Sequence, residues 1–369
     1  MAAKTKQQCL RQGNDGSGTP IIDQNCPIPT ITKPYQVLVH VAAVALNPFD
    51  HKSPSFCPTP GAIMGFDFTG TIVTRGGDVR RDLTEGTRVC GAVHGSNPSN
   101  PQTGAFAEYV VADSRLLLKP PAAWTHAQAA ALGGAGWLTA GLVLYDYLKL
   151  DGRPSAPATN GTANGDKKPV LVYGAATATG TMICQILTLS GYAPVAICST
   201  KSSAMVSSYG AVTTIDYTSL TTAAETIKTH TRNQLRLAID CIATPESLRC
   251  CMAAIGRAGG DYIAIEHTMQ EWHTRRAVHV HPTPLAYEVW GEAVTMGPPY
   301  DRDASPAKLE SAIRWTEEMQ RLVEQGMVRP HPPKALEPGF QQILDGLKIL
   351  EAGKVSGEKL VVCLGSKCS

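Results

Sequence analysis

The chain has 369 residues, a hydrophobic content of 43% and a formal net charge of +2. This length exceeds what one hydrophobic core serves, and it predicts two domains that each fold unaided. The lysines and arginines are scattered, with no basic run among aromatic residues, which excludes the electrostatic signature of a nucleic-acid-binding protein. The N-terminus is polar through Thr19 and shows no signal-peptide pattern, so we expect a cytoplasmic protein.

The first part of the chain predicts a β-rich domain. Short alternating segments among turn residues indicate strands at residues 35–45, 65–74, 86–91 and 106–111. Together they favour a barrel-like region. The longest apolar stretch, residues 127–144, predicts a buried helix of a soluble domain rather than a membrane span. Residues 151–168 are rich in Pro, Ala, Thr, Asn and Gly, and they predict a flexible surface loop.

Residues 169–189 carry the most informative pattern. An apolar strand leads into a turn of small residues, and a helix-like segment follows. Such a turn holds a dinucleotide pyrophosphate, because small side chains let the backbone approach the phosphates and the helix N-terminus offers free N–H groups. Only Gly174 and Gly180 remain of the usual glycines, and this spacing also arises by chance. The predicted cofactor-binding residues of the turn are Gly174, Ala176, Thr177, Ala178 and Thr179.

Residues 191–202 predict the next strand, which ends in Ser199, Thr200, Lys201 and Ser202. A strand that binds NAD carries an acidic residue at this point, which accepts hydrogen bonds from the ribose 2′-hydroxyl. Hydroxyls and one ammonium group suit a 2′-phosphate instead, so these four residues predict NADPH as the cofactor. The alternative is a solvated loop with an ordinary lysine.

Strands and helices then alternate as far as residue 265. Helices are expected at residues 204–209, 220–229 and 245–255, and strands at 212–215, 235–242 and 262–265. This order predicts a doubly wound parallel sheet, an α/β fold. Cofactor contacts lie beyond the carboxyl ends of such strands, where Tyr217, Cys241, Ile265 and Glu266 are placed. Each of them is equally well explained as a packing or loop residue.

The C-terminal part, from about residue 295, is expected to return to the first domain with a helix at residues 337–351 and a strand at 359–364. The predicted domains are therefore residues 1–165 with 295–369, and a nucleotide-binding domain at 166–294. The eleven cysteines include no C-x-x-C pair, so we expect no metal site and reduced, packed thiols.

Several motifs in combination resemble the medium-chain dehydrogenase/reductase superfamily. They are VALNPFD (residues 44–50), GFDFTG (65–70), GTRV (86–89), GAFAEY (104–109) and AAAL (129–132). The zinc alcohol dehydrogenases of this superfamily carry Gly-His-Glu where this chain has Gly65, Phe66 and Asp67, so the histidine ligand is missing. The resemblance implies a zinc-independent reductase with a GroES-like β-rich catalytic domain and a Rossmann nucleotide-binding domain.

A narrower resemblance is to the stand-alone enoyl reductases of fungal polyketide pathways, which act in trans on a synthase. It rests on residues 47–52, 172–179, 254–260 and 356–362. Thr177-Ala178-Thr179 discriminates most, because ordinary quinone reductases have Gly-Gly-Val there. This resemblance implies two catalytic residues, Lys52 and Thr139, near the nicotinamide and substrate. It further implies cofactor-side positions at Pro48, Asp50, His51, Val355 and Ser356.

The chemistry of this reaction fits such residues. Reduction of an α,β-unsaturated thioester requires a hydride at the β-carbon and stabilisation of the charge that develops on the thioester oxygen. A lysine or hydroxyl can hold the ribose, polarise the carbonyl or relay a proton, and we expect Lys52 to be an orienting group first. The alternatives are a surface lysine for Lys52 and a hydroxyl bonded to its own helix for Thr139. Residues 133–138 and 287–296 are expected to wall an apolar groove for the acyl chain.

Three functions remain open at this stage. The favoured one is an NADPH-dependent enoyl reductase that partners a polyketide synthase, or a hybrid of such a synthase with a peptide synthetase. The second is a free-standing quinone or enone reductase, and the third is a non-catalytic partner of the synthase. Lys52, Lys201 and the phosphate turn weigh against the third. Superfamily dimers often extend the nucleotide-domain sheet, but residues 279–284 contain two prolines that cannot donate ladder bonds, so we expect a monomer.

Overall fold

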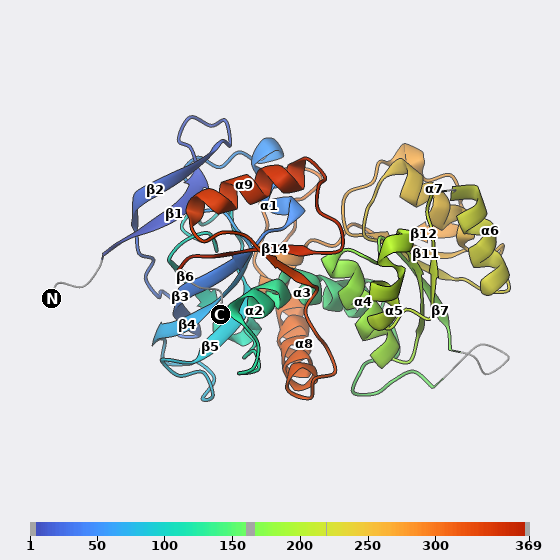
Figure 1. The fold of residues 1–369 in the computed structure, drawn as a ribbon, viewed down its shortest axis with the longest axis horizontal. Helices are drawn as coiled ribbons and strands as arrows, with labels where there is room; N and C mark the ends of the chain where they lie inside the picture. Colours follow the sequence, from blue (N-terminus) through green and yellow to red (C-terminus); the bar gives the residue numbers. More distant parts are fainter. Residues whose placement is uncertain (1–4, 160–166, 219, 366–369) are drawn as a thin grey trace. The chain divides into compact units, whose positions relative to one another are not determined.

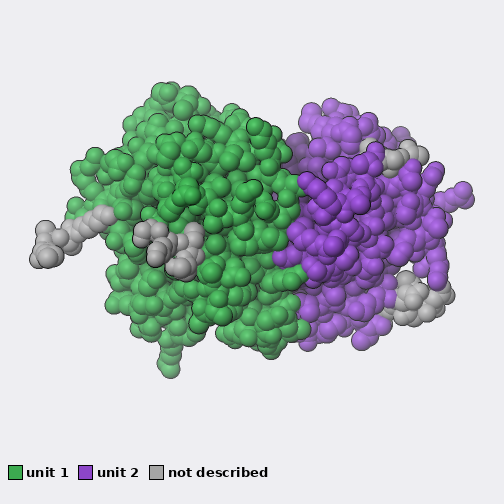
Figure 2. All heavy atoms as spheres, viewed as in Figure 1, with its two compact units in different colours: residues 1–135, 287–369 green, residues 136–286 purple. Residues whose placement is uncertain are grey.

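The computed structural model describes residues 5–159, 167–218 and 220–365. The chain divides into two compact units, residues 1–135 with 287–369, and residues 136–286 (Figure 2). The predicted division was at residues 165/166 and 294/295. Residues 136–165, which the prediction gave to the first domain, fall in the second unit, because helix α3 (Ala135–Gly141) approaches the helix that follows the phosphate turn.

The first unit contains a six-stranded sheet in the order β13-β14-β3-β4-β5, with β6 paired to β3 (Figure 1). All of its pairings are antiparallel except β13 with β14. The four strands predicted in this region are present, shifted by one to three residues at their starts. The bounds are β3 (Gln36–Ala45), β4 (Asp67–Arg75), β5 (Arg88–Ala92), β6 (Tyr109–Asp113), β13 (Pro333–Ala335) and β14 (Lys359–Cys363).

An N-terminal hairpin, β1 (Lys6–Gln12) with β2 (Pro20–Pro27), was not predicted. It also carries a correction, because Cys9 and Cys26 form a disulfide across it, with 6.4 Å between their Cα atoms. Cys363 is disulfide-bonded as well. The expectation of reduced thiols is therefore wrong for these three residues, and it holds for the free cysteines 57, 90, 184, 198, 241, 250 and 251.

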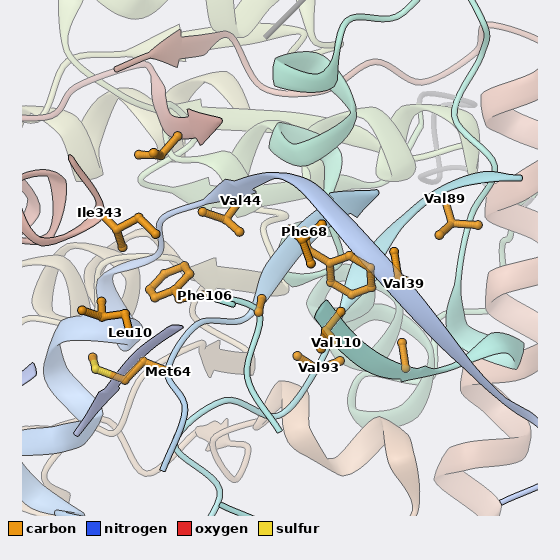
Figure 3. Close-up of a cluster of buried hydrophobic side chains, with 14 of the residues drawn as sticks. Leu10, Val39, Val44, Met64, Phe68, Val89, Val93, Phe106, Val110 and Ile343 are labelled. Carbon is orange, nitrogen blue, oxygen red and sulfur yellow. The ribbon is translucent and has the colours of Figure 1, made fainter. Parts of the chain in front are cut away.

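The helices of the first unit close its hydrophobic core. Phe340, Ile343 and Leu347 of the predicted C-terminal helix pack against the strands, and Figure 3 shows Ile343 in the same cluster as Phe68 and Phe106. The longest helix of the described chain, α8, was missed from the sequence. The bounds are α1 (Pro48–Phe56), η1 (Ser114–Leu116), α2 (His126–Leu132), η5 (Ala286–Trp290), α8 (Pro306–Glu324) and α9 (Phe340–Glu351).

The second unit is built on a parallel six-stranded sheet in the order β12-β11-β10-β7-β8-β9. The chain enters at β7, winds outward through β8 and β9, and then returns to add β10, β11 and β12 on the other side. This is the predicted doubly wound sheet, and its switch point lies between β7 and β10, where such folds bind their ligands. The strands are β7 (Pro169–Tyr173), β8 (Ala193–Ile197), β9 (Thr213–Ile215), β10 (Leu237–Asp240), β11 (Gly260–Ala264) and β12 (Val278–Val280).

The helices of this unit follow the predicted alternation, with α4 directly after the phosphate turn. Their bounds are α4 (Ala178–Leu189), η3 (Thr200–Ser202), α5 (Ser203–Ser208), α6 (Leu220–His230), α7 (Pro245–Ala254) and η4 (Gln270–Trp272). The loop predicted at residues 151–168 is without helix or strand at 151–159, and residues 160–166 lie outside the described residues.

One helical stretch, His126–Tyr147, is long and apolar enough to cross a membrane by length and composition. Its most apolar window is 78% buried inside the protein, as in the interior helix that the sequence predicts. It is not one regular helix: a turn at Gly133, with φ of +43°, separates α2 from α3, and α3 continues into a π-helical turn, η2 (Leu142–Tyr147).

Candidate active site

The phosphate turn of the second unit joins β7 to α4 and is shaped by two glycines. Gly174 has φ of +73°, a left-handed conformation that favours glycine, and a Cβ there would lie 2.6 Å from Ile242 Cγ1. A Cβ on Gly180 would lie 2.5 Å from the carbonyl oxygen of Gly174. Glycine at both positions therefore lets the helix begin directly against the strand, as a dinucleotide site requires.

Thr177 closes the turn as the N-cap of α4. Its Oγ1 accepts a hydrogen bond of 3.0 Å from the backbone N–H of Gly180, and its own N–H donates to the oxygen of Gly174 at 3.0 Å. Ala176, Ala178 and Thr179 are half-buried around it. Thr177, which replaces the first glycine of the Gly-Gly-Val pattern, does not obstruct the turn, because it is the cap that the helix needs. The residues present thus fit a pyrophosphate.

The end of β8 arranges its hydroxyl groups around one carboxylate that sequence reasoning missed. Asp216, just after β9, accepts a hydrogen bond of 2.9 Å from the N–H of Thr200 and a further bond from the Thr200 hydroxyl. Its other oxygen accepts from the N–H of Thr218 at 2.7 Å. These bonds hold the pKa of Asp216 well below its usual value. Both donors of Thr200 are therefore directed at Asp216.

The other three residues of this segment differ in exposure. Ser199 and Ser202 share a hydrogen bond of 3.0 Å between their hydroxyl oxygens, and Ser202 is buried. Lys201 is exposed on η3. A 2′-phosphate at this point would therefore meet the Lys201 ammonium group and the Ser199 hydroxyl as its accessible donors.

Further candidates in the second unit follow the carboxyl ends of strands β9, β10 and β11, and β9 is an edge strand. Tyr217 is 45% exposed after β9, while Ile265 and Glu266 are half-buried after β11. The N–H of Ile265 donates to the oxygen of Asp240 at 3.0 Å, which keeps β10 and β11 paired to their ends. Cys241 is buried, and burial raises its thiol pKa well above the usual value, as expected for a packing residue.

Thr139 lies half-buried on α3. Other threonines of the protein illustrate the alternative role considered for it, since Thr231 and Thr316 donate to the carbonyls four residues earlier at 2.7 Å. The Thr139 side chain makes no such bond within the part of the chain that the structure describes. Its hydroxyl is thus not committed to its own helix.

In the first unit, the predicted residues Pro48, Asp50, His51 and Lys52 occupy the first turns of α1. Asn47 caps this helix, and its N–H donates to Asp50 Oδ2 at 2.8 Å. Pro48 and Lys52 are exposed, and His51 is half-buried. Burial, with the nearby charge of Lys52, lowers the pKa of His51, so this imidazole is neutral at pH 7.

Beneath this helix start lies a buried ion pair that sequence reasoning also missed. Lys359 Nζ donates to Asp67 Oδ2 at 2.9 Å, and the two side chains are only 6% and 1% exposed. The same ammonium group bonds to Asn47 Oδ1, while Asn47 Nδ2 donates to Asp67 Oδ2 at 3.0 Å. The backbone N–H groups of Gly134 and Ala135 complete the network, each 2.8 Å from Asp67 Oδ1.

This network connects the two cofactor-side segments predicted in the first unit. Val355 packs against the hydrophobic core and Ser356 is exposed on the loop that leads into Lys359. Asp50 is buried beside the network, and its pKa rises to about 7, chiefly because burial penalises the charged form and also because Asp67 is near. Asp67 stands at the glutamate of the Gly-His-Glu motif, which was the one available signal for it.

Aromatic rings gather around a cavity in the same unit. Phe66 lies 5.3 Å from Tyr287 between ring centroids, and His94 stacks on Tyr287 at 3.6 Å. A cavity of about 310 Å³ is lined by His94, Tyr287 and Trp290 together with polar side chains such as Asn97, Asn100 and Thr103. Tyr287, Trp290 and residues 292–294 line this cavity. Residues 133–138, predicted as the other wall of an apolar groove, do not line it, and its lining is more polar than we expected.

His94 is the unusual group of this cavity. Its Nε2 is buried and has no hydrogen-bond partner among the described residues. Burial lowers the pKa of His94 to about 3, so the ring is neutral under ordinary conditions. His94 thus lines the cavity with the face of a neutral ring, while its Nε2 is inaccessible to solvent.

Known proteins resemble this chain along almost its whole length. Residues 33–122 match the alcohol dehydrogenase GroES-like domain. The trans-enoyl reductase ffsC of Aspergillus flavipes is 41% identical, over 98% of this chain and 96% of that protein. The trans-enoyl reductase poxP of Penicillium oxalicum is 41% identical, over 97% and 93%. An alcohol dehydrogenase superfamily protein of Novosphingobium aromaticivorans shares the fold, with a TM-score of 0.75 and 22% identity over 98% and 100% of the two chains. The predicted GroES-like and Rossmann architecture is confirmed.

Proposed function

The chain belongs to the fungal trans-enoyl reductases of the medium-chain dehydrogenase/reductase superfamily, and we propose that it uses NADPH to reduce an enoyl thioester carried by a polyketide synthase. The observation that carries this proposal is the identity of 41% to such reductases across nearly the whole chain. The enzyme is thus an oxidoreductase with a nicotinamide cofactor. We propose, in addition, that the cofactor is NADPH, that the partner is a polyketide synthase, and that individual residues have the roles given below.

The end of β8 supports NADPH over NADH. Lys201 offers an exposed ammonium group at the position where an NAD site has a carboxylate. The nearest carboxylate, Asp216, has one oxygen bonded to Thr200 and the other to Thr218. Asp216 thus already accepts three hydrogen bonds from its own chain, whereas the Lys201 ammonium group and the Ser199 hydroxyl suit a 2′-phosphate.

The remaining cofactor contacts follow from the residues around the two segments. We assign the pyrophosphate to Gly174, Ala176, Thr177, Ala178 and Thr179, and the nucleoside side to Tyr217, Ile265 and Glu266. In the first unit we assign the nicotinamide ribose to Pro48, Asp50, His51 and Lys52 and to the loop of Val355 and Ser356. The network of Lys359, Asp67 and Asn47 positions both of these segments.

The reaction adds a hydride and a proton across the carbon–carbon double bond. When bound, the cofactor would supply the hydride that adds to the β-carbon. The electron pair of the carbon–carbon double bond would then form a bond between Cα and the thioester carbon, and the carbonyl pair would move to the oxygen. Lys52 and Thr139 are assigned to this step, Lys52 to hold the ribose and Thr139 to donate a hydrogen bond to a reacting oxygen. The Cα carbon then takes a proton and the thioester carbonyl re-forms.

The cavity of the first unit fits the carrier-bound part of the substrate. Asn97, Asn100 and Thr103 provide hydrogen-bonding groups for an amide-containing pantetheine arm. Tyr287 and Trp290 provide apolar surface for the acyl chain, and Phe66 packs against both of them. We further propose a monomer, because β12 is a three-residue edge strand followed by Pro282 and Pro284; light scattering would then give a mass near 39.2 kDa.

The test is the oxidation of NADPH and NADH with crotonyl-pantetheine and with a simple quinone. We expect turnover of the thioester with a preference for NADPH. Lys201→Glu places a carboxylate beside the phosphate, and we expect it to raise the KM for NADPH by about tenfold or more, equivalent to one charge-assisted contact. Lys168→Glu is the matched control, because Lys168 is an exposed lysine at the amino end of β7.

Each outcome separates the alternatives. Turnover confined to the quinone would replace the proposal by a free-standing quinone reductase. Cofactor binding without turnover of either acceptor would favour a non-catalytic partner. An equal effect of both lysine variants on the KM for NADPH would contradict the assignment of Lys201.

A further inference from the structure

A cluster of two histidines and an aspartate lies on the edge of the parallel sheet, apart from the residues assigned to the cofactor. His279 belongs to β12, the edge strand, and His281 follows it, still in register because its N–H donates to the oxygen of Tyr262 at 2.9 Å. Asp261 lies on the adjacent strand β11, directly opposite His279. The neighbouring positions 262, 278 and 280 face the other side and pack in the core of the sheet.

The strand pattern alone brings these side chains together. Residues two apart on a strand share a face, so His279 and His281 point the same way. Opposed residues of paired strands share a face as well, which adds Asp261. The ring planes of the two imidazoles are inclined at 79° with their centroids 4.5 Å apart, so the rings meet edge to face rather than stack.

We propose that Asp261, His279 and His281 form a binding site for a divalent transition-metal ion of the zinc type. The three candidate ligand atoms all lie within 4.8 Å of one another, and Asp261 Oδ1 is 2.9 Å from His281 Nε2. Two ligand atoms that each lie about 2.0–2.2 Å from a tetrahedral zinc ion are roughly 3.3–3.6 Å apart. This separation lies between the 2.9 Å contact and the 4.8 Å limit. Small side-chain rotations therefore suffice, and the ion takes the place of the hydrogen bond between Asp261 and His281.

The donor types select the class of ion. Two imidazole nitrogens and one carboxylate oxygen are ligands that zinc, nickel and copper accept, whereas magnesium and calcium prefer oxygen ligands throughout. Three protein ligands leave a fourth position for water. A cavity of about 570 Å³ lies beside the cluster and is lined by Asp261 and His279, so an ion and its water can reach the site.

One positively charged side chain beside the site, Arg275, is already hydrogen-bonded to backbone oxygens. Arg275, which also lines this cavity, donates to the backbone oxygens of Met252, Ile255 and Gly256 at 2.6–2.9 Å. Its guanidinium group is thus bound to carbonyl oxygens on the far side of the strand pair. The carboxylate of Asp261 is 49% exposed, and its Oδ1 lies 2.9 Å from His281 Nε2.

The site is independent of the proposed reaction. Asp261 is the second residue of β11 and lies toward the amino end of the strand, whereas cofactors bind beyond the carboxyl ends. The ion is therefore structural: it fastens the edge strand β12 to β11 and stabilises the folded second unit by binding to it. Loss of the ion would leave the kinetics of the reductase unchanged at a temperature where the protein remains folded.

The experiment is a calorimetric titration of Zn²⁺ into the full-length protein after removal of metals by a chelator. We expect one equivalent to bind and the midpoint of thermal unfolding to rise with Zn²⁺ concentration. His279→Asn and His281→Asn are each expected to weaken Zn²⁺ binding by at least about tenfold. Loss of a residue that only hydrogen-bonds to a metal ligand already weakens metal binding by about that factor. His230→Asn is the matched control, an exposed histidine at the end of α6, and it should bind Zn²⁺ like the wild type.

The proposal is overturned if Zn²⁺ fails to bind saturably, or if His279→Asn, His281→Asn and the control bind it equally. NADPH-dependent turnover of each variant, measured in parallel without metal, reports on folding. A variant that retains this turnover and loses Zn²⁺ binding supports the site, and a failure of the metal titration leaves the reductase assignment untouched.

Discussion

Replacing Lys359 by methionine tests the buried network most directly. The change removes the ammonium group that lies 2.9 Å from Asp67, and both side chains are almost fully buried. Losing one partner of a buried pair costs about 3–5 kcal/mol, because the other charge stays buried without compensation. Asp67 keeps three donors, from Asn47, Gly134 and Ala135, so we expect a loss near the lower limit, about 3 kcal/mol.

The same change should weaken cofactor binding. Lys359 follows the loop of Val355 and Ser356 and bonds to Asn47, which begins the helix of Asp50 and Lys52. Without it the two segments lose their common support, and we expect the KM for NADPH to rise by about tenfold, corresponding to about 1.4 kcal/mol. Lys354→Met is the control, because Lys354 is an exposed lysine five residues earlier.

Urea denaturation of Lys359→Met, Asp67→Asn and the double variant measures the pair itself. The double variant has neither charge, so it should be less destabilised than the sum of the two single changes, by up to about 3 kcal/mol. Additive effects would show that the ion pair is not coupled. A loss below about 1 kcal/mol for Lys359→Met, the value of an exposed pair, would refute the argument from burial.

Two further predictions concern the turn and Asp50. Gly180→Ala places a Cβ 2.5 Å from the oxygen of Gly174, and it should cost about 1–3 kcal/mol of stability and most of the NADPH affinity. The control is Gly136→Ala, whose Cβ meets nothing closer than 3.7 Å and which should be neutral or slightly stabilising. Equal behaviour of the two variants in urea denaturation and cofactor titration would disprove the role of the close approach. The pKa of Asp50 is about 7 in the folded protein, and its ordinary value is 3.8. Between about pH 4 and about pH 7 the folded state therefore keeps a proton on Asp50 that the unfolded state has lost. Stability should fall as pH rises through this range, by at most about 4 kcal/mol from this group. Asp50→Asn should remove that dependence in denaturation curves taken across this range, and an unchanged pH profile would show that Asp50 titrates normally.

The sequence predicted those parts of the protein whose signal is local. Most strands of both sheets follow apolar patterns, although β13 is exposed and was not predicted. The phosphate turn lies within seven residues of the chain. The hairpin of β1 and β2 was missed because Gln7 and Gln12 are buried as hydrogen-bonded polar residues: Gln7 Oε1 accepts from Tyr109 N–H at 2.6 Å, and Gln12 Oε1 from Thr59 N–H at 2.7 Å. A hydrophobic period cannot reveal such residues. Helix α8, in contrast, shows a readable pattern, since Ala312, Trp315, Met319, Leu322 and Val323 are buried at helical spacing.

The network of the active site could not be predicted, because its members are remote in the chain. Lys359 and Asn47 are separated by 312 positions, and no local pattern shows that the lysine at the start of a strand is buried. The identity of Asp67 was visible as a departure from Gly-His-Glu, but its partner was not. Pairing of this kind follows from the tertiary fold, which pairs β14 with β3 and β3 with β4.

The departure at Phe66 has a structural counterpart that bears on the chemistry. A phenylalanine ring offers no ligand atom, and it packs 5.3 Å from Tyr287 and 5.9 Å from Trp290, so an aromatic wall stands where the related dehydrogenases place a zinc ligand. Its neighbour Asp67 is held by Lys359 instead. Stabilisation of the charge on a thioester oxygen must then come from hydrogen-bond donors, for which we assign the Thr139 hydroxyl. The phenylalanine that replaces the histidine ligand thus removes zinc-dependent polarisation of a carbonyl and leaves that task to hydrogen-bond donors of the protein.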